Sequence, residues 1–378
     1  MRFLHTSDLH IGKTVNGFSM VEEQAHVLEQ IIAYAKEYQV QAVLLSGDLY
    51  DRSVPSSQAV MLMDQFLTQL VEMGITVLAI GGNHDSGERI GFANRILEKK
   101  GLFLEGMAEK EVKYVDLDQV RFHLLPFARP AQIRTLYGVE AVTYDQCMAE
   151  RLNHVHYLEG GCNVLLAHEF VVDSGKEPLL SDSETRVSVG TADQVEASHF
   201  KRFDYVALGH IHRKQKIGKR QVYYSGSPIK YSFSEANTEK AVILGETDER
   251  GKVSVSFLPL KPIHDMRIIK GRLADLISPE VVEAADEEDY MLAILTDEED
   301  LLDPMGSLRS VYPNMMQLQW EQREGEEKEG EQTFQTLKEK HPMELFEDFF
   351  GQVTGKELSE EQQKLLEKIL EQAGRMLV

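Results

Sequence analysis

The sequence predicts a mixed α/β (α+β) protein: a two-sheet β-sandwich core flanked by helices, with a small α+β domain and a C-terminal helical hairpin. Short apolar runs alternate with amphipathic stretches through residue 100, which is typical of α/β folds. Beyond that point short apolar runs predominate and indicate further strands. Two sheets packed face to face, with helices outside, would accommodate both patterns.

The first half alternates strands and helices. The expected strands are 1–5, 40–45 and 75–80, and the expected helices are 22–38, 55–70 and 89–100. In the first helix the apolar residues recur at helical spacing, so that one face would be buried. Pro55 near the first turn and Gly74 beyond the end frame the second helix.

The second half is dominated by strands. The expected segments are 112–115, 120–125, 164–167, 205–208, 222–224, 241–244 and 253–258. We assign the last three of these to a second sheet.

Composition changes divide the chain into four parts. Residues 1–260 would form the main domain and 261–320 a small α+β capping domain. Residues 321–340 begin with a charged, glycine-punctuated stretch that is typical of a solvated linker. Residues 341–378 show two short amphipathic helices, which predict a helical hairpin.

The charge balance limits the possible functions. The 378 residues carry a net charge of −22, which argues against nucleic-acid binding through a broad basic surface. It is compatible with a nucleic-acid enzyme whose positive charge comes from metal ions or a partner subunit. Two cysteines give no disulfide framework. Because no apolar run has signal-peptide or membrane-spanning length, we expect no membrane association and a cytoplasmic location.

Polar side chains follow five of the predicted strands at the point where each strand ends. They are Asp8, His10, Asp48, Asn83, His84, His168, His210 and His212. A lone histidine after a strand is more often a capping or core residue, and we assign most of the other histidines, among them His123, to that class. His5 is adjacent to the motif but has no motif partner. The conjunction of five such junctions favours one shared site, with Asp48 as a bridge between two ions.

The predicted ligands are carboxylates, imidazoles and one amide, without a thiolate. This set suits two divalent ions, with Mn²⁺ preferred and Mg²⁺, Fe²⁺ or Zn²⁺ as alternatives. Two ions about 3.5–4 Å apart clamp the attacking and leaving oxygens of a phosphoryl displacement. The sequence therefore predicts phosphoester hydrolysis.

The motifs resemble those of the calcineurin-like metallophosphoesterases. They are Asp8-x-His10, Gly47-Asp48-x-x-Asp51, Gly82-Asn83-His84-Asp85, His168 and Gly209-His210-x-His212. Within that superfamily, residues 5–13 and 125–130 resemble the bacterial SbcD nucleases, which are related to the nuclease subunit of the double-strand-break repair complex. Taken together, the motifs span roughly the first 230 residues.

The resemblance implies a role for each matching residue. Asp8, His10 and His212 would bind one ion, and Asn83, His168 and His210 the other, with Asp48 shared. His84 would contact the scissile phosphate or protonate the leaving oxygen, and Asp85 would orient its ring. Asp51 would lie behind the ligands.

The resemblance also implies partners. The family pairs with itself and with an SMC-like ATPase, SbcC, and this chain has no Walker A motif of its own. The hairpin would dock that ATPase, although packing back onto the preceding domain is the alternative. Its apolar residues are Phe346, Phe349, Phe350, Leu365, Leu366 and Ile369. The helices around Met61 and Leu62 and around Ile90 are candidates for the homodimer contact, and core packing is an equal alternative.

The function implied is the nuclease subunit of an SbcCD-type complex that is nucleoid-associated. It would act as a 3′–5′ exonuclease on double-stranded DNA ends and as an endonuclease on hairpins and single strands, in DNA repair, recombination and replication. A small-molecule or protein metallophosphatase or phosphodiesterase would use the same ligands. A metal-bound scaffold that recruits an ATPase to DNA ends is a third possibility.

Overall fold

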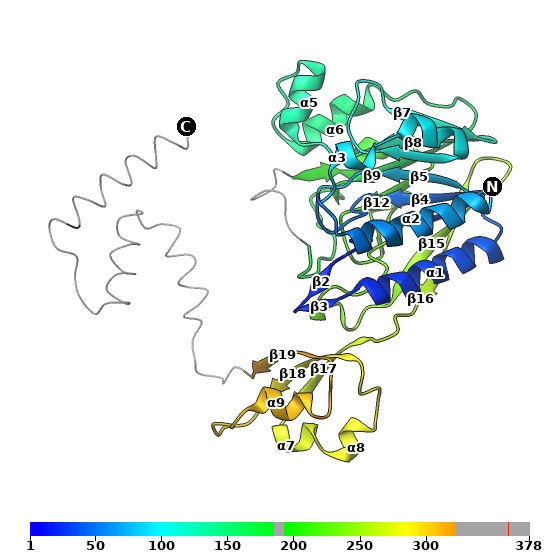
Figure 1. Ribbon diagram of the computed structural model, residues 1–378. Coiled ribbons are helices and arrows are strands. Elements are labelled where there is room, and N and C mark those ends of the chain that lie inside the picture. The colour runs from blue at the N-terminus through cyan, green and yellow to red at the C-terminus, as the bar shows by residue number, and fades with distance from the viewer. Residues whose placement is uncertain (185–192, 322–361, 363–378) are drawn as a thin grey trace. The chain divides into compact units, whose positions relative to one another are not determined.

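A computed structural model describes residues 1–184, 193–321 and 362 (Figure 1). The chain divides into two compact units, Met1–Gln319 and Trp320–Val378, and nearly all described residues belong to the first. Most of the predicted linker and hairpin lies outside the described residues, which include only residue 321 of the linker and residue 362 of the hairpin. All six predicted partner-binding residues also lie outside them. The proposed domain boundary at 260–261 remains a prediction.

The first sheet has six strands in the order β16-β15-β1-β4-β5-β6. Their bounds are β1 (Arg2–Thr6), β4 (Ala42–Ser46), β5 (Thr76–Ile80), β6 (Leu102–Glu105), β15 (Lys240–Thr247) and β16 (Val253–Leu260). The strands β1, β4, β5 and β6 are parallel, and β15 pairs antiparallel with β1. The assignment of 241–244 and 253–258 to the second sheet was therefore wrong, because the open edge of β1 pairs with a strand that lies far along the chain.

The second sheet has the order β13-β14-β12-β9-β8-β7. Its strands are β7 (Lys113–Leu117), β8 (Val120–Leu125), β9 (Cys162–His168), β12 (Tyr205–Gly209), β13 (Gln215–Lys216) and β14 (Val222–Tyr224). The four central strands β8, β9, β12 and β14 are parallel. The strand predicted at 222–224 is confirmed, but it pairs with β12 and β13 and not with the strands at 241–244 and 253–258.

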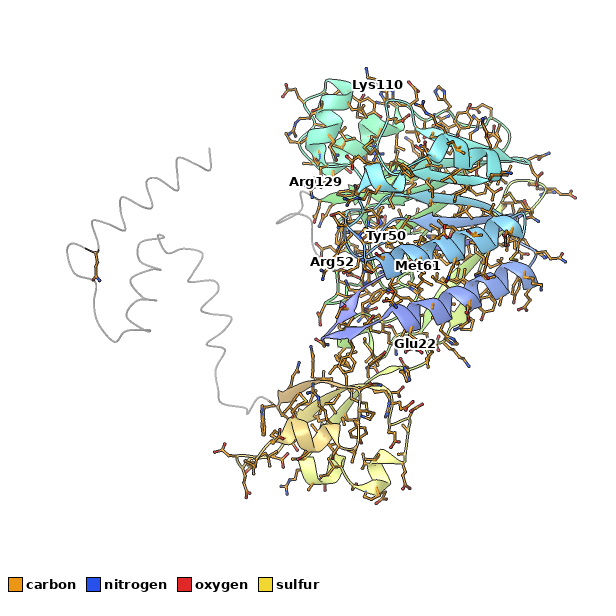
Figure 2. The ribbon with its side chains drawn as sticks, in the orientation of Figure 1. Glu22, Tyr50, Arg52, Met61, Lys110 and Arg129 are labelled. Carbon is orange, nitrogen blue, oxygen red and sulfur yellow. The ribbon has the colours of Figure 1, made fainter. Side chains whose placement is uncertain are left out.

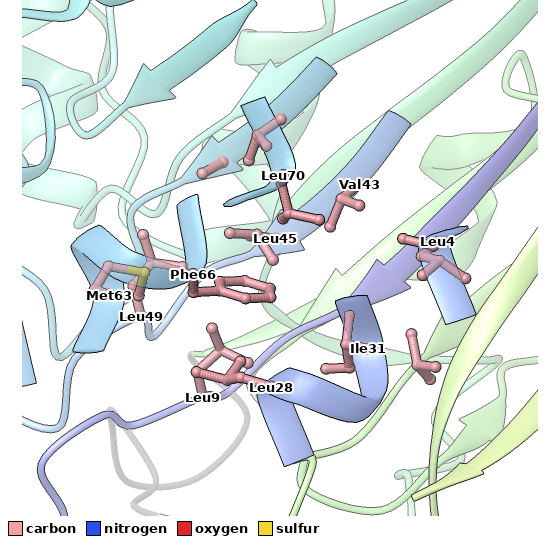
Figure 3. Close-up of a cluster of buried hydrophobic side chains, with 14 of the residues drawn as sticks. Leu4, Leu9, Leu28, Ile31, Val43, Leu45, Leu49, Met63, Phe66 and Leu70 are labelled. Carbon is pink, nitrogen blue, oxygen red and sulfur yellow. The ribbon is translucent and has the colours of Figure 1, made fainter. Parts of the chain in front are cut away.

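Two hydrophobic layers hold the sheets in place. Between them, Phe3 and Leu44 from the first sheet pack with Phe122, Leu166 and Tyr205 from the second. On the outer face of the first sheet, α1 (Val21–Glu37) and α2 (Ser57–Glu72) cover a second layer, shown in Figure 3. The expected two-sheet core with flanking helices is confirmed, and burial of both faces explains why the parallel strands read as continuous apolar runs.

Several local elements differ from the prediction. The expected helix 89–100 is three short pieces, α3 (Gly87–Ile90), α4 (Asn94–Leu97) and a 3₁₀ turn, and it breaks where Ala93 adopts a left-handed φ of 60°. Helices α5 (Pro130–Tyr137) and α6 (Tyr144–Leu152) were not predicted. Both lie in a segment interrupted by polar residues and proline, where the apolar spacing is short and weak.

Short strands complete the first 260 residues. β2 (Thr14–Val15) pairs with β3 (Phe18–Ser19), and β10 (Phe170–Val172) pairs with β11 (Gln194–Glu196). No helix in the described part of the chain is both long and apolar enough to cross a membrane.

The segment after residue 260 forms the small α+β fold that was expected. A three-stranded sheet of β17 (Met266–Gly271), β18 (Tyr290–Leu295) and β19 (Met315–Trp320) is accompanied by α7 (Leu273–Leu276), α8 (Pro279–Val282) and α9 (Pro304–Arg309). Its own core includes Met291, Leu308 and Tyr312. Glu23 on α1 accepts hydrogen bonds from the backbone N–H groups of Ile263 and His264, which anchors the entry to this segment.

Candidate metal centre

The predicted ligands follow the carboxyl ends of five parallel strands, which come from both sheets. Asp8 and His10 follow β1, Asp48 follows β4, Asn83 follows β5, His168 ends β9, and His210 and His212 follow β12. Backbone hydrogen bonds join the first two loops: the Asp8 N–H donates to Gly47 O and the His10 N–H to Asp48 O, each at 3.0 Å. The fold therefore brings together residues up to 204 positions apart in the sequence, from Asp8 to His212.

Four of these residues adopt a backbone conformation that non-glycine residues rarely use. The φ angles are 52° at Asp8, 42° at His10, 50° at Asp48 and 98° at His210. Such conformations cost of the order of 1–3 kcal/mol each and persist only where the surrounding structure imposes them. Their concentration here indicates that the side chains are aimed at one place at the expense of local stability.

Three glycines of the motifs are needed for close packing at the site. A Cβ at Gly47 would lie 2.3 Å from His168 Nδ1, one at Gly82 would lie 2.2 Å from Asp48 Oδ1, and one at Gly209 would lie 2.0 Å from Ser46 O. No side chain fits at these distances. The glycines that flank the predicted ligands thus allow strands from two sheets to approach each other.

One group of ligand atoms comes from Asp8, His10 and His212, which all lie within 4.8 Å of one another and are buried. The Nε2 atoms of His10 and His212 are 3.2 Å apart. The Asp8 carboxylate accepts the backbone N–H of His210 at 2.9 Å. This is the group predicted to hold one ion.

A second group is formed by Asn83, His168 and His210. The amide oxygen of Asn83 lies 3.0 Å from His168 Nε2 and 3.1 Å from His210 Nδ1. His168 Nδ1 contacts the carbonyl oxygen of Ser46 at 2.9 Å and must donate to it, so that Nε2 is the nitrogen through which the ring would bind an ion once it is deprotonated. These are the residues predicted for the other ion.

Asp48 lies between the two groups. Its Oδ2 atom is 3.3 Å from His168 Nε2 and 3.7 Å from His10 Nε2, and its Oδ1 atom accepts the backbone N–H of His84 at 2.9 Å. One carboxylate oxygen thus faces a histidine of each group, which is the placement expected of a bridging ligand.

The ring of His84 lies beside this centre, and its partner differs from the prediction. Its Nδ1 contacts the carbonyl oxygen of Asp51 at 3.0 Å, so the ring is oriented by that carbonyl and its Nε2 is left for other contacts. The Asp85 carboxylate instead accepts the backbone N–H groups of Leu49, Tyr50 and Gly82. Among the described hydrogen bonds Asp85 makes none to the His84 ring, so it holds the loops rather than the ring.

Asp51 lies next to the His10 ring. Its carboxylate pairs with Lys13 at 2.7 Å and lies 3.8 Å from His10 Nδ1. Arg52, whose side chain is largely exposed, also lies 3.6 Å from the Asp51 carboxylate, whereas Arg89 donates to the Ser53 carbonyl.

Burial controls the protonation of the site. It raises the pKa of Asp8 to about 7 and lowers the pKa of His10 and of His210 to about 3 each. Burial would also raise the pKa of Asp48, but the charge and hydrogen bond of His168 outweigh it and hold that pKa well below its usual range. Asp48 in turn raises the pKa of His168 to about 10 against the effect of burial.

These side chains fit divalent ions. Buried carboxylate and imidazole atoms and one half-buried amide converge without a thiolate, and two imidazole Nε2 atoms face one another at 3.2 Å across the first group. The donor set admits Mn²⁺, Mg²⁺, Fe²⁺ and Zn²⁺ alike.

Three residues that contact the site were not predicted. Ser183 lies 2.7 Å from His212 Nδ1, Glu235 lies behind Ser183, and Lys240 pairs with Glu235. They come from separate segments and belong to no motif, so no sequence spacing connects them with His212. Lys240 directly precedes the apolar run 241–244 and is buried, and this charge at the start of a strand is the local feature that could have drawn attention to them.

Two family models match the chain. One, described as calcineurin-like phosphoesterase, matches residues 1–214, which is more than half of the chain, and the other, described as type 5 capsule protein repressor C-terminal domain, matches residues 262–354. Together with the two sheets and the converging carboxylates and histidines, the first match defines the class as that of the metal-dependent phosphoesterases.

A curated relative narrows the class. The chain is 32% identical over 322 residues to the SbcD subunit of the nuclease SbcCD from Staphylococcus epidermidis, covering 84% of this chain and 85% of that protein. The chain therefore belongs to the calcineurin-like phosphoesterases and, within them, to the SbcD nuclease-subunit family. The resemblance expected from the motifs is confirmed. A dimetal phosphatase from Danio rerio is structurally similar with a TM-score of 0.39 at 11% identity, over 68% of this chain and 98% of that one.

Proposed function

We propose that this chain is the nuclease subunit of an SbcCD-type complex and hydrolyses DNA phosphodiesters with two divalent ions, Mn²⁺ by preference. The observation that carries the proposal is the position of Asp48 Oδ2 between His168 Nε2 at 3.3 Å and His10 Nε2 at 3.7 Å. Asp8 and His212 complete the His10 end of the site, and Asn83 and His210 complete the His168 end.

The chemistry divides between the ions and the protein. Two ions bound at this site would supply a hydroxide near neutral pH and neutralise charge on the phosphoryl oxygens. The Asp51 carbonyl fixes the His84 ring so that its Nε2 is available to contact the phosphate or to hand a proton to the leaving oxygen. Asp85 keeps the loops that carry Asp48 and His84 together through its three backbone contacts.

The test compares two substrates in the presence of Mn²⁺. Wild type should cut both a DNA hairpin and bis-p-nitrophenyl phosphate, whereas His84→Ala should lose about 10²–10⁴-fold on both while binding the same amount of metal. His156→Ala is the matched control, because that histidine is exposed and pairs with Glu111. Cleavage of the small diester alone, also with the ATPase subunit added, would favour a metallophosphatase or phosphodiesterase. Full cellular repair by His84→Ala would favour a scaffold.

The finer activities belong to the same proposal: 3′–5′ exonuclease action on double-stranded ends, endonuclease action on hairpins and single strands, and a nucleoid-associated place in repair, recombination and replication. What supports them is the similarity to the SbcCD nuclease subunit. The partner would be the SMC-like ATPase subunit, SbcC, docked on Phe346, Phe349 and Phe350 and on Leu365, Leu366 and Ile369. Replacing Phe349 by Glu should abolish co-purification with that subunit and leave cleavage of the small diester unchanged.

Homodimer formation through the outer face of α2 and the residues after α3 is also proposed. Met61 on α2 (Figure 2) is 62% exposed, and Phe92 and Ile96 are 78% and 71% exposed. Of the other candidates, Leu62 packs against the core and Ile90 is buried, so core packing accounts for them. Met61→Glu should shift the protein from dimer to monomer in analytical ultracentrifugation.

A further inference from the structure

The ring of His212 is held from behind by a serine and a buried ion pair. Ser183 Oγ lies 2.7 Å from His212 Nδ1 and 2.7 Å from Glu235 Oε1. The other carboxylate oxygen of Glu235 pairs with Lys240, and both of these side chains are buried. Four side chains thus form a chain that leads from the metal centre into the interior: His212, Ser183, Glu235 and Lys240.

The direction of the hydrogen bonds follows from the donors available. The Lys240 ammonium can only donate, and the Glu235 carboxylate that it binds can only accept. The backbone N–H of Tyr231 also donates to Glu235 Oε1, at 3.3 Å. The single Ser183 proton therefore goes to Glu235, and the serine oxygen accepts the Nδ1–H of His212.

The consequence is a defined tautomer of His212. With its proton on Nδ1, the ring keeps a lone pair on Nε2, and this is the atom that lies 3.2 Å from His10 Nε2 inside the first group of ligands. A hydrogen bond on the outer nitrogen of a metal-binding histidine fixes both the tautomer and the orientation of the ring.

We propose that Ser183, oriented by Glu235 and Lys240, is a positioning residue that holds His212 ready to bind a divalent ion through Nε2. This inference rests on the proposed two-metal function.

The short segment that carries Ser183 is held at two further points, one beside His212 and one beside Glu235. Glu184 accepts the backbone N–H of His212 at 2.6 Å, so that the ring and the main chain of His212 are both bound. The backbone N–H of Asp182 donates to Ser234 Oγ at 2.9 Å. Ser183 is therefore placed by contacts that do not depend on its own hydroxyl, and removing that hydroxyl takes away its contacts to the His212 ring, to Glu235 and to Ser181 while these backbone contacts remain.

The experiment is a Mn²⁺ titration by calorimetry of the full chain, stripped of metal, with three variants. Ser183→Ala removes the hydroxyl, Ser183→Thr keeps it, and Ser234→Ala loosens the same segment without touching the His212 ring. Ser183→Ala should weaken one of two Mn²⁺ binding events by about 10–100-fold and leave the other unchanged. Ser183→Thr and Ser234→Ala should each stay within about threefold of wild type.

If Ser183→Ala binds Mn²⁺ at both sites as tightly as wild type does, the inference about Ser183 is overturned but the proposed function is not. If Ser234→Ala loses as much Mn²⁺ affinity as Ser183→Ala does, the role of Ser183 is merely structural and the inference is overturned as well. A wild-type chain without any Mn²⁺ site would contradict the proposed function as well. A second measurement needs no variant of Ser183: nitrogen NMR of metal-free protein, with His212 assigned through His212→Gln, should find the proton on Nδ1. A proton on Nε2 would overturn the inference.

Discussion

The two ends of the metal centre are oriented by different kinds of contact. At one end the outer nitrogen of His168 donates to a main-chain carbonyl, that of Ser46, at 2.9 Å. At the other end the outer nitrogen of His212 donates to a side-chain hydroxyl, that of Ser183, at 2.7 Å. A carbonyl at the end of a strand is fixed by the sheet and cannot be removed by substitution, whereas a hydroxyl can. The orientation of His168 is therefore set by the backbone of the sheet, whereas the orientation of His212 depends on a side chain that a substitution can remove.

The largest effect should come from Asp48, which belongs to both ends. Asp48→Ala removes the oxygen that faces His10 and His168 and should lower diester cleavage by on the order of 10⁴-fold. Mn²⁺ titration should show both binding events weakened. A variant that lost only one event would contradict the bridging position of Asp48.

A glycine substitution should damage the scaffold end selectively. Gly47 has φ +90°, and a Cβ there would lie 2.3 Å from His168 Nδ1. Gly47→Ala should lower the free energy of unfolding by about 1–3 kcal/mol and displace His168, so that only the Mn²⁺ site of that end weakens. Chemical denaturation and the metal titration measure the two effects.

Gly17→Ala separates backbone strain from the clash. Gly17 has nearly the same φ, +88°, but nothing lies within 4 Å of a Cβ placed there. The free energy of unfolding of Gly17→Ala should be about 1–2 kcal/mol lower than that of wild type, because alanine is strained in the left-handed conformation. The variant should bind Mn²⁺ as wild type does. Equal metal affinities in the two variants would contradict the close approach of Gly47 to His168.

A buried histidine outside the site should make the stability of the protein depend on pH. Burial lowers the pKa of His123 to about 4, so between pH 6.5 and 4 the unfolded chain binds a proton that the folded chain does not. Stability should therefore fall as the pH falls through this window. His123→Phe should reduce the slope of the unfolding free energy by about 1.4 kcal/mol per pH unit.

The control for that slope is His156→Gln, because His156 is exposed. Urea denaturation of metal-free protein at several pH values from 4 to 6.5 provides the measurement. An unchanged slope in His123→Phe would show that this buried histidine does not contribute to acid destabilisation.

The sequence could predict the ligands of the site but not the residues that orient them. Asp8, Asp48, Asn83, His168 and the histidines after β12 follow apolar strands in short motifs, so strand ends and glycines were enough to find them. Their orienting partners are set by tertiary contacts between distant segments. Ser183 and Glu235 are 52 positions apart, and nothing in the local pattern connects them.

The errors have the same origin. Asp85 was expected to orient His84 because the family resemblance implied that role, but the loop turns the carboxylate toward three backbone N–H groups and leaves His84 to the Asp51 carbonyl. Strand β15 was expected in the second sheet, yet it pairs with β1. Local patterns identify strands, whereas the choice of partner depends on which edge is open.

The most direct test of the two-metal account is an anomalous difference map from crystals of the protein grown with Mn²⁺. The account predicts two peaks about 3.5–4 Å apart, one on each side of Asp48 Oδ2, with one contacted by His212 Nε2 and the other by His168 Nε2. A single peak, or two peaks that do not share Asp48, would contradict it.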